Sequence, residues 1–197
     1  IVGKFDESLD KIKRAQELDP GSPIMNNQGG QPYASYTRQY DQAIEAYRRA
    51  LLIDEGFWPA RMYLSAAYAE KGMYEEAFAE IRKAKDLHKG WHPQIEMYIG
   101  IFFAGMGRTE EAQHVLNDLL ERSKQRYVPP SMISWFYLNL GEIDQYFDWL
   151  KRALEERDPL LPWLGVVSDS LPDSVRSDPR FIEAMEKSGL DKYWLDK

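Results

Sequence analysis

Five segments of the chain repeat one arrangement of small and large apolar residues. They begin at residues 3, 38, 72, 107 and 141, so successive starts lie 35, 34, 35 and 34 residues apart. The sixth, tenth and thirteenth positions of each segment carry the pattern. The sixth residues are Ser8, Ala43, Ala77, Ala112 and Tyr146, the tenth are Ile12, Tyr47, Ile81, Leu116 and Leu150, and the thirteenth are Ala15, Ala50, Ala84, Leu119 and Ala153. Because these positions are three or four residues apart, they share one helix face, and each segment is predicted to be a helix.

The stretches that precede the last three segments also have a helical pattern. They cover residues 58–71, 93–106 and 127–140. A glycine at the start of the following segment (Gly72, Gly107 and Gly141) permits a tight turn between the two helices. A hairpin of this kind cannot bury its apolar faces alone, so neighbouring hairpins must stack. We therefore expect an all-α solenoid.

These columns resemble the tetratricopeptide repeat family, whose unit is a helix–turn–helix of about 34 residues. The matching large, small and aromatic residues are Leu64, Ser65 and Tyr68, then Ile99, Gly100 and Phe103, then Ile133, Ser134 and Tyr137. The resemblance implies a right-handed α-solenoid of repeat hairpins over residues 1–159. The expected divisions are a half repeat at 1–22 and repeats at about 23–57, 58–92, 93–126 and 127–159.

The resemblance also implies a protein-binding groove lined by the first helix of each hairpin. The positions that line it in the family fall here on Met62, Tyr63, Ala66 and Glu70, on Met97, Tyr98, Ile101 and Ala104, and on Ser131, Met132, Trp135, Leu138 and Asn139. Methionines and aromatic residues suit adaptable contact with a peptide or helix. The alternative, that these side chains simply pack between hairpins, is equally open for each of them. Relatives that bind acidic chaperone tails have Lys, Arg and Asn at several of these positions, so that role is disfavoured.

The C-terminal segment, residues 160–197, lacks the period. Asp178 as N-cap and Pro179 in the first turn predict a helix to about Ser188, where Gly189 ends it, and we expect this helix to cap the last hairpin. The segment resembles the closing piece of bacterial multidomain repeat proteins. That resemblance implies an alternative function, as the sensory or regulatory portion of a signalling protein with a winged-helix, nucleotide cyclase or kinase domain.

One repeat has an irregular first helix. Gly29, Gly30 and Pro32 lie where the first helix of the second repeat is expected, and an interior proline costs roughly 3 kcal/mol. We expect a kinked, shortened or unwound helix around residues 28–32. This break is either an opening where a partner meets free backbone groups or, as we favour, a decayed repeat.

Charge and composition limit the classes of partner that can be expected. The net charge of −7 argues against a nucleic-acid surface, because binding phosphates requires clustered cations. No apolar run approaches the roughly 20 residues of a spanning helix, so membrane insertion is not expected. Cysteine is absent, which excludes thiol chemistry and leaves the compartment open, with the cytoplasm slightly favoured. Because the chain begins at Ile1 within an apparent structural unit, we expect it to be a fragment of a longer protein.

The sequence offers no catalytic, cofactor or metal site. His88 and His92 have the spacing of a helical metal pair, but Gly90 and Pro93 interrupt any helix there and no third ligand stands beside them. Gly29 and Gly30 lack the Lys and Ser or Thr of a phosphate loop. We therefore predict an interaction module, not an enzyme, that binds a protein or peptide.

The N-terminal edge is the second candidate contact surface. The segment at residues 3–20 has no preceding helix of its own, so the face of Leu9, Ile12 and Ala15 is expected to lack a partner within the chain. Exposed apolar faces usually mark contact surfaces. We therefore expect this edge either to contact upstream residues or to form a homodimer.

Overall fold

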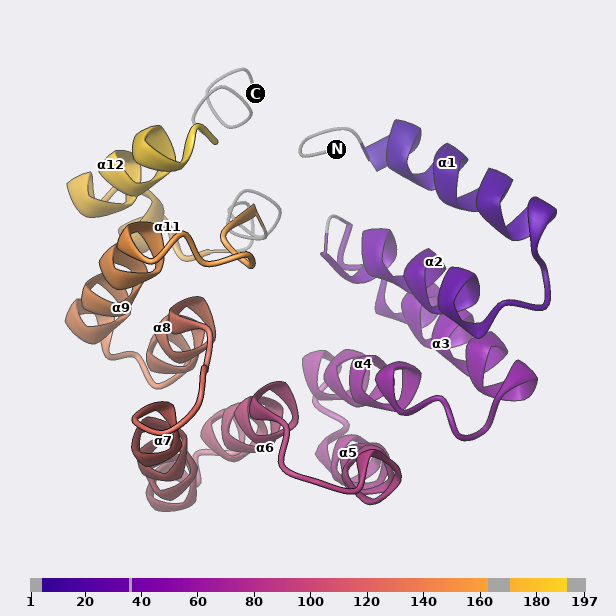
Figure 1. The fold of residues 1–197 in the computed structure, drawn as a ribbon, viewed down its shortest axis with the longest axis horizontal. Coiled ribbons are helices and arrows are strands. Elements are labelled where there is room, and N and C mark those ends of the chain that lie inside the picture. Colours follow the sequence, from indigo (N-terminus) through magenta and orange to yellow (C-terminus); the bar gives the residue numbers. More distant parts are fainter. Residues whose placement is uncertain (1–4, 36, 163–170, 191–197) are drawn as a thin grey trace. The chain divides into compact units, whose positions relative to one another are not determined.

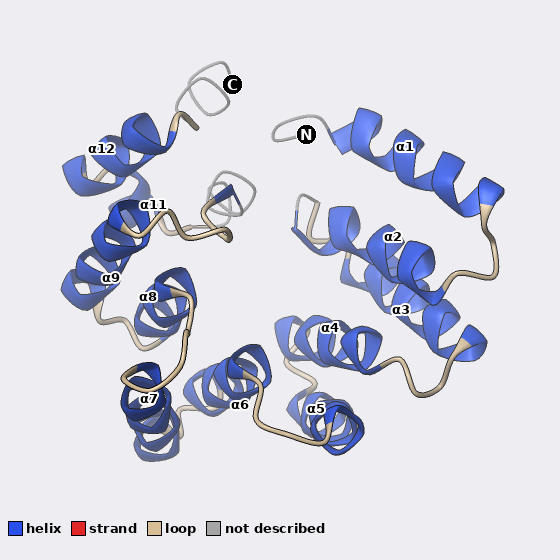
Figure 2. Ribbon diagram, viewed as in Figure 1, coloured by secondary structure: helices blue, strands red, loops and turns tan. Residues whose placement is uncertain are grey.

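Every element that the structure describes is a helix (Figure 2). The structure is a computed structural model, and it describes residues 5–35, 37–162 and 171–190. The chain divides into two compact units, one ending at Phe102 and the other beginning at Phe103. Within the described ranges, no helix has the length and apolar character needed to cross a bilayer.

The first unit is built from helix hairpins, as the repeat predicts. Its helices are α1 (Phe5–Leu18), α2 (Pro23–Ser35), α3 (Tyr40–Ile53), α4 (Trp58–Glu70), α5 (Tyr74–His88) and most of α6 (Pro93–Gly105). Helix α2 packs on α3, α4 packs on α5, and α3 packs on α4 (Figure 1). The repeated positions form the core, since Ala43, Ala77 and Ile81 are all 0% exposed.

The turns between paired helices use a left-handed residue. Gly72, Gly107 and Gly141 have φ values of 74°, 73° and 77°, which glycine adopts without steric cost. Arg38 occupies the same place between α2 and α3 and has a φ of 53°. The irregular repeat therefore keeps the backbone geometry of the regular ones.

Helix α2 is continuous, so the expectation of a shortened or unwound helix is wrong. It spans 13 residues, the same length as α4 and α6. The start is supported by Ser22, whose hydroxyl accepts from the Met25 backbone N–H at 3.3 Å. Asn26 adds hydrogen bonds from its side-chain amide to the carbonyls of Pro20 and Ser22, at 3.1 and 2.9 Å. Pro32 lies in the last turn, where the loss of one helical hydrogen bond affects few later residues.

Helix α1 partly covers the edge that we expected to be unpartnered. It packs on α2, and Leu9, Ile12 and Ala15 are each half-buried. The Gln16 side chain donates to the carbonyl of Met25 at 3.4 Å. A homodimer through this edge stays a prediction.

The second unit contains α7 (Thr109–Ser123), α8 (Pro130–Asn139), α9 (Ile143–Glu155), α11 (Asp173–Arg176) and α12 (Pro179–Ser188). Helix α8 packs on α9, and α12 packs on α9 (Figure 1). Helix α12 has the predicted bounds. Asp178 caps it by accepting from the backbone N–H of Arg180 at 2.9 Å, and Gly189 ends it with a φ of 69°. The predicted capping helix is confirmed, whereas α11 was not foreseen.

Asp158 fixes the chain where the last hairpin ends. Its side chain is buried, and its carboxylate accepts from the backbone N–H of Ser131, at the start of α8, at 2.8 Å. The other carboxylate oxygen accepts from the backbone N–H of Leu160, also at 2.8 Å. One side chain thus satisfies a free N–H at the start of α8 and holds the segment that leaves α9.

Candidate functional site

The predicted groove residues of the first unit fall into two groups. Met62 is 1% exposed and Met97 is 6% exposed, so both pack in the core and offer almost no surface to a partner. Tyr63, Ala66 and Ile101 are half-buried and keep part of their surface. The two methionines therefore pack between the hairpins. Tyr63, Ala66 and Ile101 remain candidate contacts for a partner.

Tyr63 lies at the centre of a polar cluster drawn from three helices. The side chains of Gln94 of α6 and Gln31 of α2 lie near its hydroxyl and act to lower its pKa. Gln94 also acts to lower the pKa of Tyr98. Burial raises the pKa of Tyr63 and Tyr98, and the glutamine contacts only partly oppose this. Both phenols are therefore neutral donors at neutral pH. We call the four residues Gln31, Tyr63, Gln94 and Tyr98 the Tyr–Gln face.

A buried tyrosine supports this face from behind. Tyr47 of α3 is 1% exposed, and its ring stacks on that of Tyr63 with centroids 5.9 Å apart and planes at 25°. Burial, followed by the nearby Tyr98 and Tyr63, raises the pKa of Tyr47. The Tyr63 ring is therefore held by packing before any ligand arrives.

Gln31 and Gln94 were missed by the sequence prediction. Gln31 lies 35 residues before Ala66 and 70 before Ile101, so it belongs to a column that we had assigned to the groove. The glycines and proline of α2 favour a decayed repeat in the sequence, so they give no reason to expect groove contacts from that helix. Gln94 lies in the first turn of α6, outside the positions taken from the family.

The charges on the first helices of this unit are few. Helix α2 has none, and α4 and α6 carry only Arg61, Glu70 and Glu96. Glu96 is 12% exposed and pairs with Lys85 of α5 at 2.7 Å. Glu70 is exposed and accepts from the Tyr40 hydroxyl at 3.0 Å. The remaining charge, Arg61, is the one cation of the three helices.

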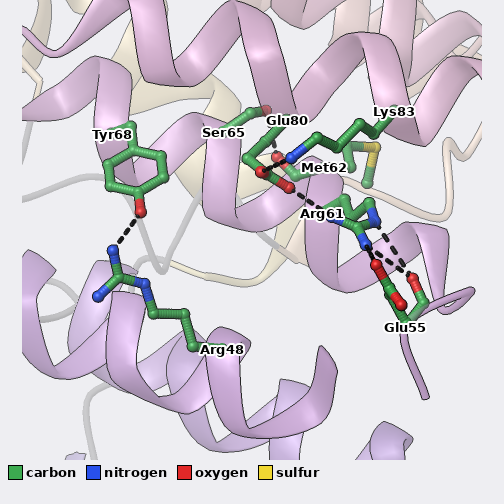
Figure 3. A network of polar contacts seen from close by, with 8 residues as sticks. All are labelled: Arg48, Glu55, Arg61, Met62, Ser65, Tyr68, Glu80 and Lys83. Atoms are coloured by element: carbon green, nitrogen blue, oxygen red, sulfur yellow. Dashed lines mark hydrogen bonds and ion pairs between the residues drawn. The ribbon is translucent and has the colours of Figure 1, made fainter. Parts of the chain in front are cut away.

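Arg61 is engaged in a network of polar contacts, in which Arg61 and Glu80 are largely covered and Glu55 and Lys83 are exposed (Figure 3). Its side chain is 10% exposed and donates to the Glu80 carboxylate of α5 at 2.8 Å. Two further N–H groups donate to the backbone carbonyl of Glu55 at 3.2 and 3.0 Å. Lys83 also pairs with Glu80 at 2.7 Å. Arg61 thus ties α4 to α5 and to the turn after α3, and its partners Glu55 and Glu80 lie outside the Tyr–Gln face.

The predicted groove residues of the second unit lie on α8. Met132, Trp135 and Leu138 are half-buried, and Trp135 and Leu138 pack against the core that α9 and α12 form. Asn139 is exposed, but its amide donates to the Trp135 carbonyl of its own helix at 2.8 Å. These side chains keep some surface without the linked polar cluster of the first unit.

His88 and His92 are brought together, but as a packed aromatic group. Their ring centroids are 4.9 Å apart, and the Trp58 ring lies 4.8 Å from the first and 5.0 Å from the second. Burial and the neighbouring His88 lower the pKa of His92. Within the part of the chain that the structure describes, no group of three or more His, Cys, Asp or Glu residues could hold a metal ion.

Comparisons with known proteins agree with the fold of helix hairpins. The tetratricopeptide repeat family matches residues 33–57. The peroxisomal targeting signal receptor of Candida glabrata is 32% identical over 85 residues, which are 43% of this chain and 14% of the receptor. That of Kluyveromyces lactis is 30% identical over 86 residues, 44% of this chain and 15% of the receptor. The chain thus spans a small part of the length of these relatives.

Solved structures match over most of the chain. A thermophilic tetratricopeptide repeat protein of Thermus thermophilus has a TM-score of 0.63 at 19% identity, covering 85% of this chain and 91% of that one. A tetratricopeptide repeat protein of Parabacteroides merdae has a TM-score of 0.63 at 13% identity, covering 98% and 78%. At identities this low, the similarity shows the fold alone. It confirms the all-α solenoid class. The chain therefore has the fold of tetratricopeptide repeat proteins, and its residues 33–57 match that family.

Proposed function

We propose that the chain is a protein–protein interaction module and that the Tyr–Gln face of its first unit binds a peptide or helix of a partner. The observation that carries this proposal is the linked set of phenol and amide groups on α2, α4 and α6. These groups are half-buried and keep surface for a ligand. Aromatic side chains backed by a packed core are typical binding anchors.

The matched relatives support the same class of function. By name they are receptors for a peroxisomal targeting signal, which is a protein-recognition role. We infer no signal specificity from them, because the match covers so little of their length. A non-enzymatic role is part of the proposal, since the Tyr–Gln face offers neutral groups and no nucleophile paired with a base.

Affinity capture tests the proposal. The wild-type chain and the Tyr63→Ala, Gln31→Ala and Tyr127→Ala variants are immobilised, and bound proteins are compared. Tyr127 is an exposed tyrosine of the second unit, 59% accessible, and serves as the matched control. We expect the Tyr63 and Gln31 variants to lose the same partner and the Tyr127 variant to keep it. Retention of every partner by both face variants would refute a binding role for this face.

Gln31→Ala guards against a loss that reflects unfolding. Tyr63 packs against the core, so its removal also lowers stability. Gln31 is only half-buried, and its replacement removes a polar contact with Tyr63 without opening the core. Circular dichroism melting of each variant separates the two causes.

A further inference from the structure

We propose that an exposed apolar edge of the first unit docks a basic amphipathic helix of a partner protein. The edge is formed by Leu18, Ile24, Leu52, Ile53 and Leu87, and we call these five residues the apolar rim. Each of them is at least 40% exposed. None belongs to the Tyr–Gln face, so this inference does not depend on the proposed function.

The hairpin topology brings the residues of the apolar rim to one edge. They lie at helix ends, namely at the end of α1, in the first turn of α2, and in the last turns of α3 and α5. Helices α2 and α3 form a hairpin, so the start of α2 lies beside the end of α3 (Figure 1). The rings of Trp58 and His88, with centroids 4.8 Å apart, join the start of α4 to the end of α5. The rim therefore follows the turns that link successive hairpins.

The fold does not require apolar residues at this edge. Leu18, Ile53 and Leu87 occupy the sixteenth position of their segments, where the segments of the second unit have Arg122 and Glu156. Each of these charged residues pairs with the residue four positions before it, at 2.7 and 2.6 Å. Hairpins of this chain thus end with charged side chains as well as with apolar ones. The packing of a hairpin therefore does not explain the apolar residues of the rim.

Leu52 departs furthest from the repeat pattern. It is 86% exposed and lies one residue before the end of α3. The other four segments have an acidic residue at the same position, namely Glu17, Asp86, Glu121 and Glu155. Single exposed apolar residues are common on protein surfaces, whereas a contiguous set of them marks an interaction site. A partner that covers Leu52 gains the free energy of burying a leucine side chain.

The charges beside the rim favour a basic partner. Residues 17–22 and 52–57 contain no Lys or Arg, and their four acidic residues are all exposed: Glu17, Asp19, Asp54 and Glu55. Arg14 and Arg61 each approach one of these carboxylates, at 2.8 and 3.5 Å, which leaves the turns negative. A second copy of this edge and an anionic membrane are negative as well, so both are disfavoured. A helix whose apolar face is flanked by Lys and Arg complements the rim in shape and charge.

Selection from a display library tests the proposal. Helical peptides randomised at their surface positions are panned on the wild-type chain, and we expect a class of binders with one apolar face flanked by Lys and Arg. Leu52→Gln should weaken these binders about tenfold or more, because the burial of a leucine side chain is lost. Ile182→Gln, which replaces an exposed apolar residue of α12, is the matched control and should bind like the wild type. Circular dichroism melting should show that neither variant unfolds.

The charges of the rim are tested separately. The double variant Glu17→Gln with Asp19→Asn should weaken the same binders and reduce the dependence of their affinity on salt. Absence of basic amphipathic binders, or binders indifferent to Leu52→Gln, would overturn the proposal. Sensitivity of other binders to Gln31→Ala bears only on the Tyr–Gln face, so the two surfaces are tested independently.

Two further measurements exclude other occupants of the rim. Flotation with vesicles of phosphatidylcholine and phosphatidylserine should leave the chain unbound, and vesicle binding that Leu52→Gln abolishes would assign the rim to a membrane instead. Sedimentation velocity of the chain alone should give the same result for the wild type and for Leu52→Gln. A dimer that this substitution dissociates would show that a second copy covers the rim.

Discussion

The ring of Tyr47 occupies the space that a side chain at Gly30 would need. A Cβ atom built on Gly30 would lie 2.4 Å from Cε1 of that ring. Gly30 therefore permits α2 to approach α3 closely, and it stands in the same column as the small residues Ser65 and Gly100. This packing argues against a decayed repeat, because the glycine is required by its neighbour.

Replacing Gly30 should cost far more than replacing Gly29. Gly30→Ala forces a buried aromatic ring to move, so we expect a loss of roughly 1–3 kcal/mol in the free energy of unfolding. At Gly29 the nearest atom to a Cβ is the Gln16 side-chain nitrogen, at 2.6 Å, which is the flexible end of a long side chain. Gly29→Ala should be close to neutral, since helix propensity favours alanine by about 1 kcal/mol. Urea denaturation of both variants measures the difference, and equal losses would contradict the assigned contact.

Removing Arg61 should destabilise the first unit. Arg61→Met leaves the Glu80 carboxylate with Lys83 alone and the Glu55 carbonyl without its donors. We expect a loss of roughly 1.5–3 kcal/mol, as for hydrogen bonds to charged groups. Chemical denaturation followed by circular dichroism gives the value.

An exposed ion pair provides the control for Arg61. Arg49 pairs with Glu45 on the surface of α3 at 3.0 Å, so Arg49→Met should cost only about 0–1 kcal/mol. The double variant Arg61→Met with Glu80→Met should recover part of the loss, because it no longer buries a carboxylate whose remaining partner is the exposed Lys83. An Arg61 effect no larger than that of Arg49 would show that the network contributes little.

The lowered pKa of His92 predicts a loss of stability in acid. The unfolded chain binds this proton near the ordinary histidine pKa of 6.5, whereas the folded chain binds it only at lower pH. The stabilising contribution is therefore present above about pH 6.5 and declines as the pH falls below that value. Thermal melting across this range should show a shallower decline in His92→Gln than in the wild type. An identical pH profile would mean that another group is responsible.

Arg38 offers a test of backbone strain at the turn. Arg38→Ala and Arg38→Gly remove the same side-chain contacts, which include a 3.1 Å hydrogen bond to the Tyr40 hydroxyl. They differ in the left-handed φ of 53°, which costs an L-residue roughly 1–2 kcal/mol and glycine little. We expect the glycine variant to be the more stable by about 1 kcal/mol in equilibrium unfolding. If the alanine variant matches it, the turn carries no strain.

The repeated columns predicted the fold because helix packing leaves a periodic trace. Ala43, Ala77 and Ile81 were assigned to a buried face from their spacing alone, and each is fully buried. The bounds of α12 followed from the capping chemistry of Asp178 and Gly189. In both cases the residues that carry the signal are close together in the sequence or lie at the ends of one helix.

The continuity of α2 and the residues of the candidate site could not be predicted, because they depend on contacts between helices that residue spacing does not reveal. Gly29 and Pro32 argue locally against a helix, yet packing on α1 and α3 stabilises α2 enough to outweigh them. Met62 and Met97 share a column with groove positions, and only the structure shows them buried. The Tyr–Gln face joins three repeats, and the contacts of Tyr63 with Gln31 and Gln94 each span more than 30 residues of sequence.

Site-specific photocrosslinking tests the central claim most directly. A benzophenone amino acid is placed at Gln28, on α2 one turn before Gln31, or at Gln42, an exposed glutamine on α3, and the partner recovered by affinity capture is added. If the face holds the partner, the partner crosslinks from position 28 and not from position 42. Crosslinking from position 42 alone would place the partner on the second helices and contradict the account.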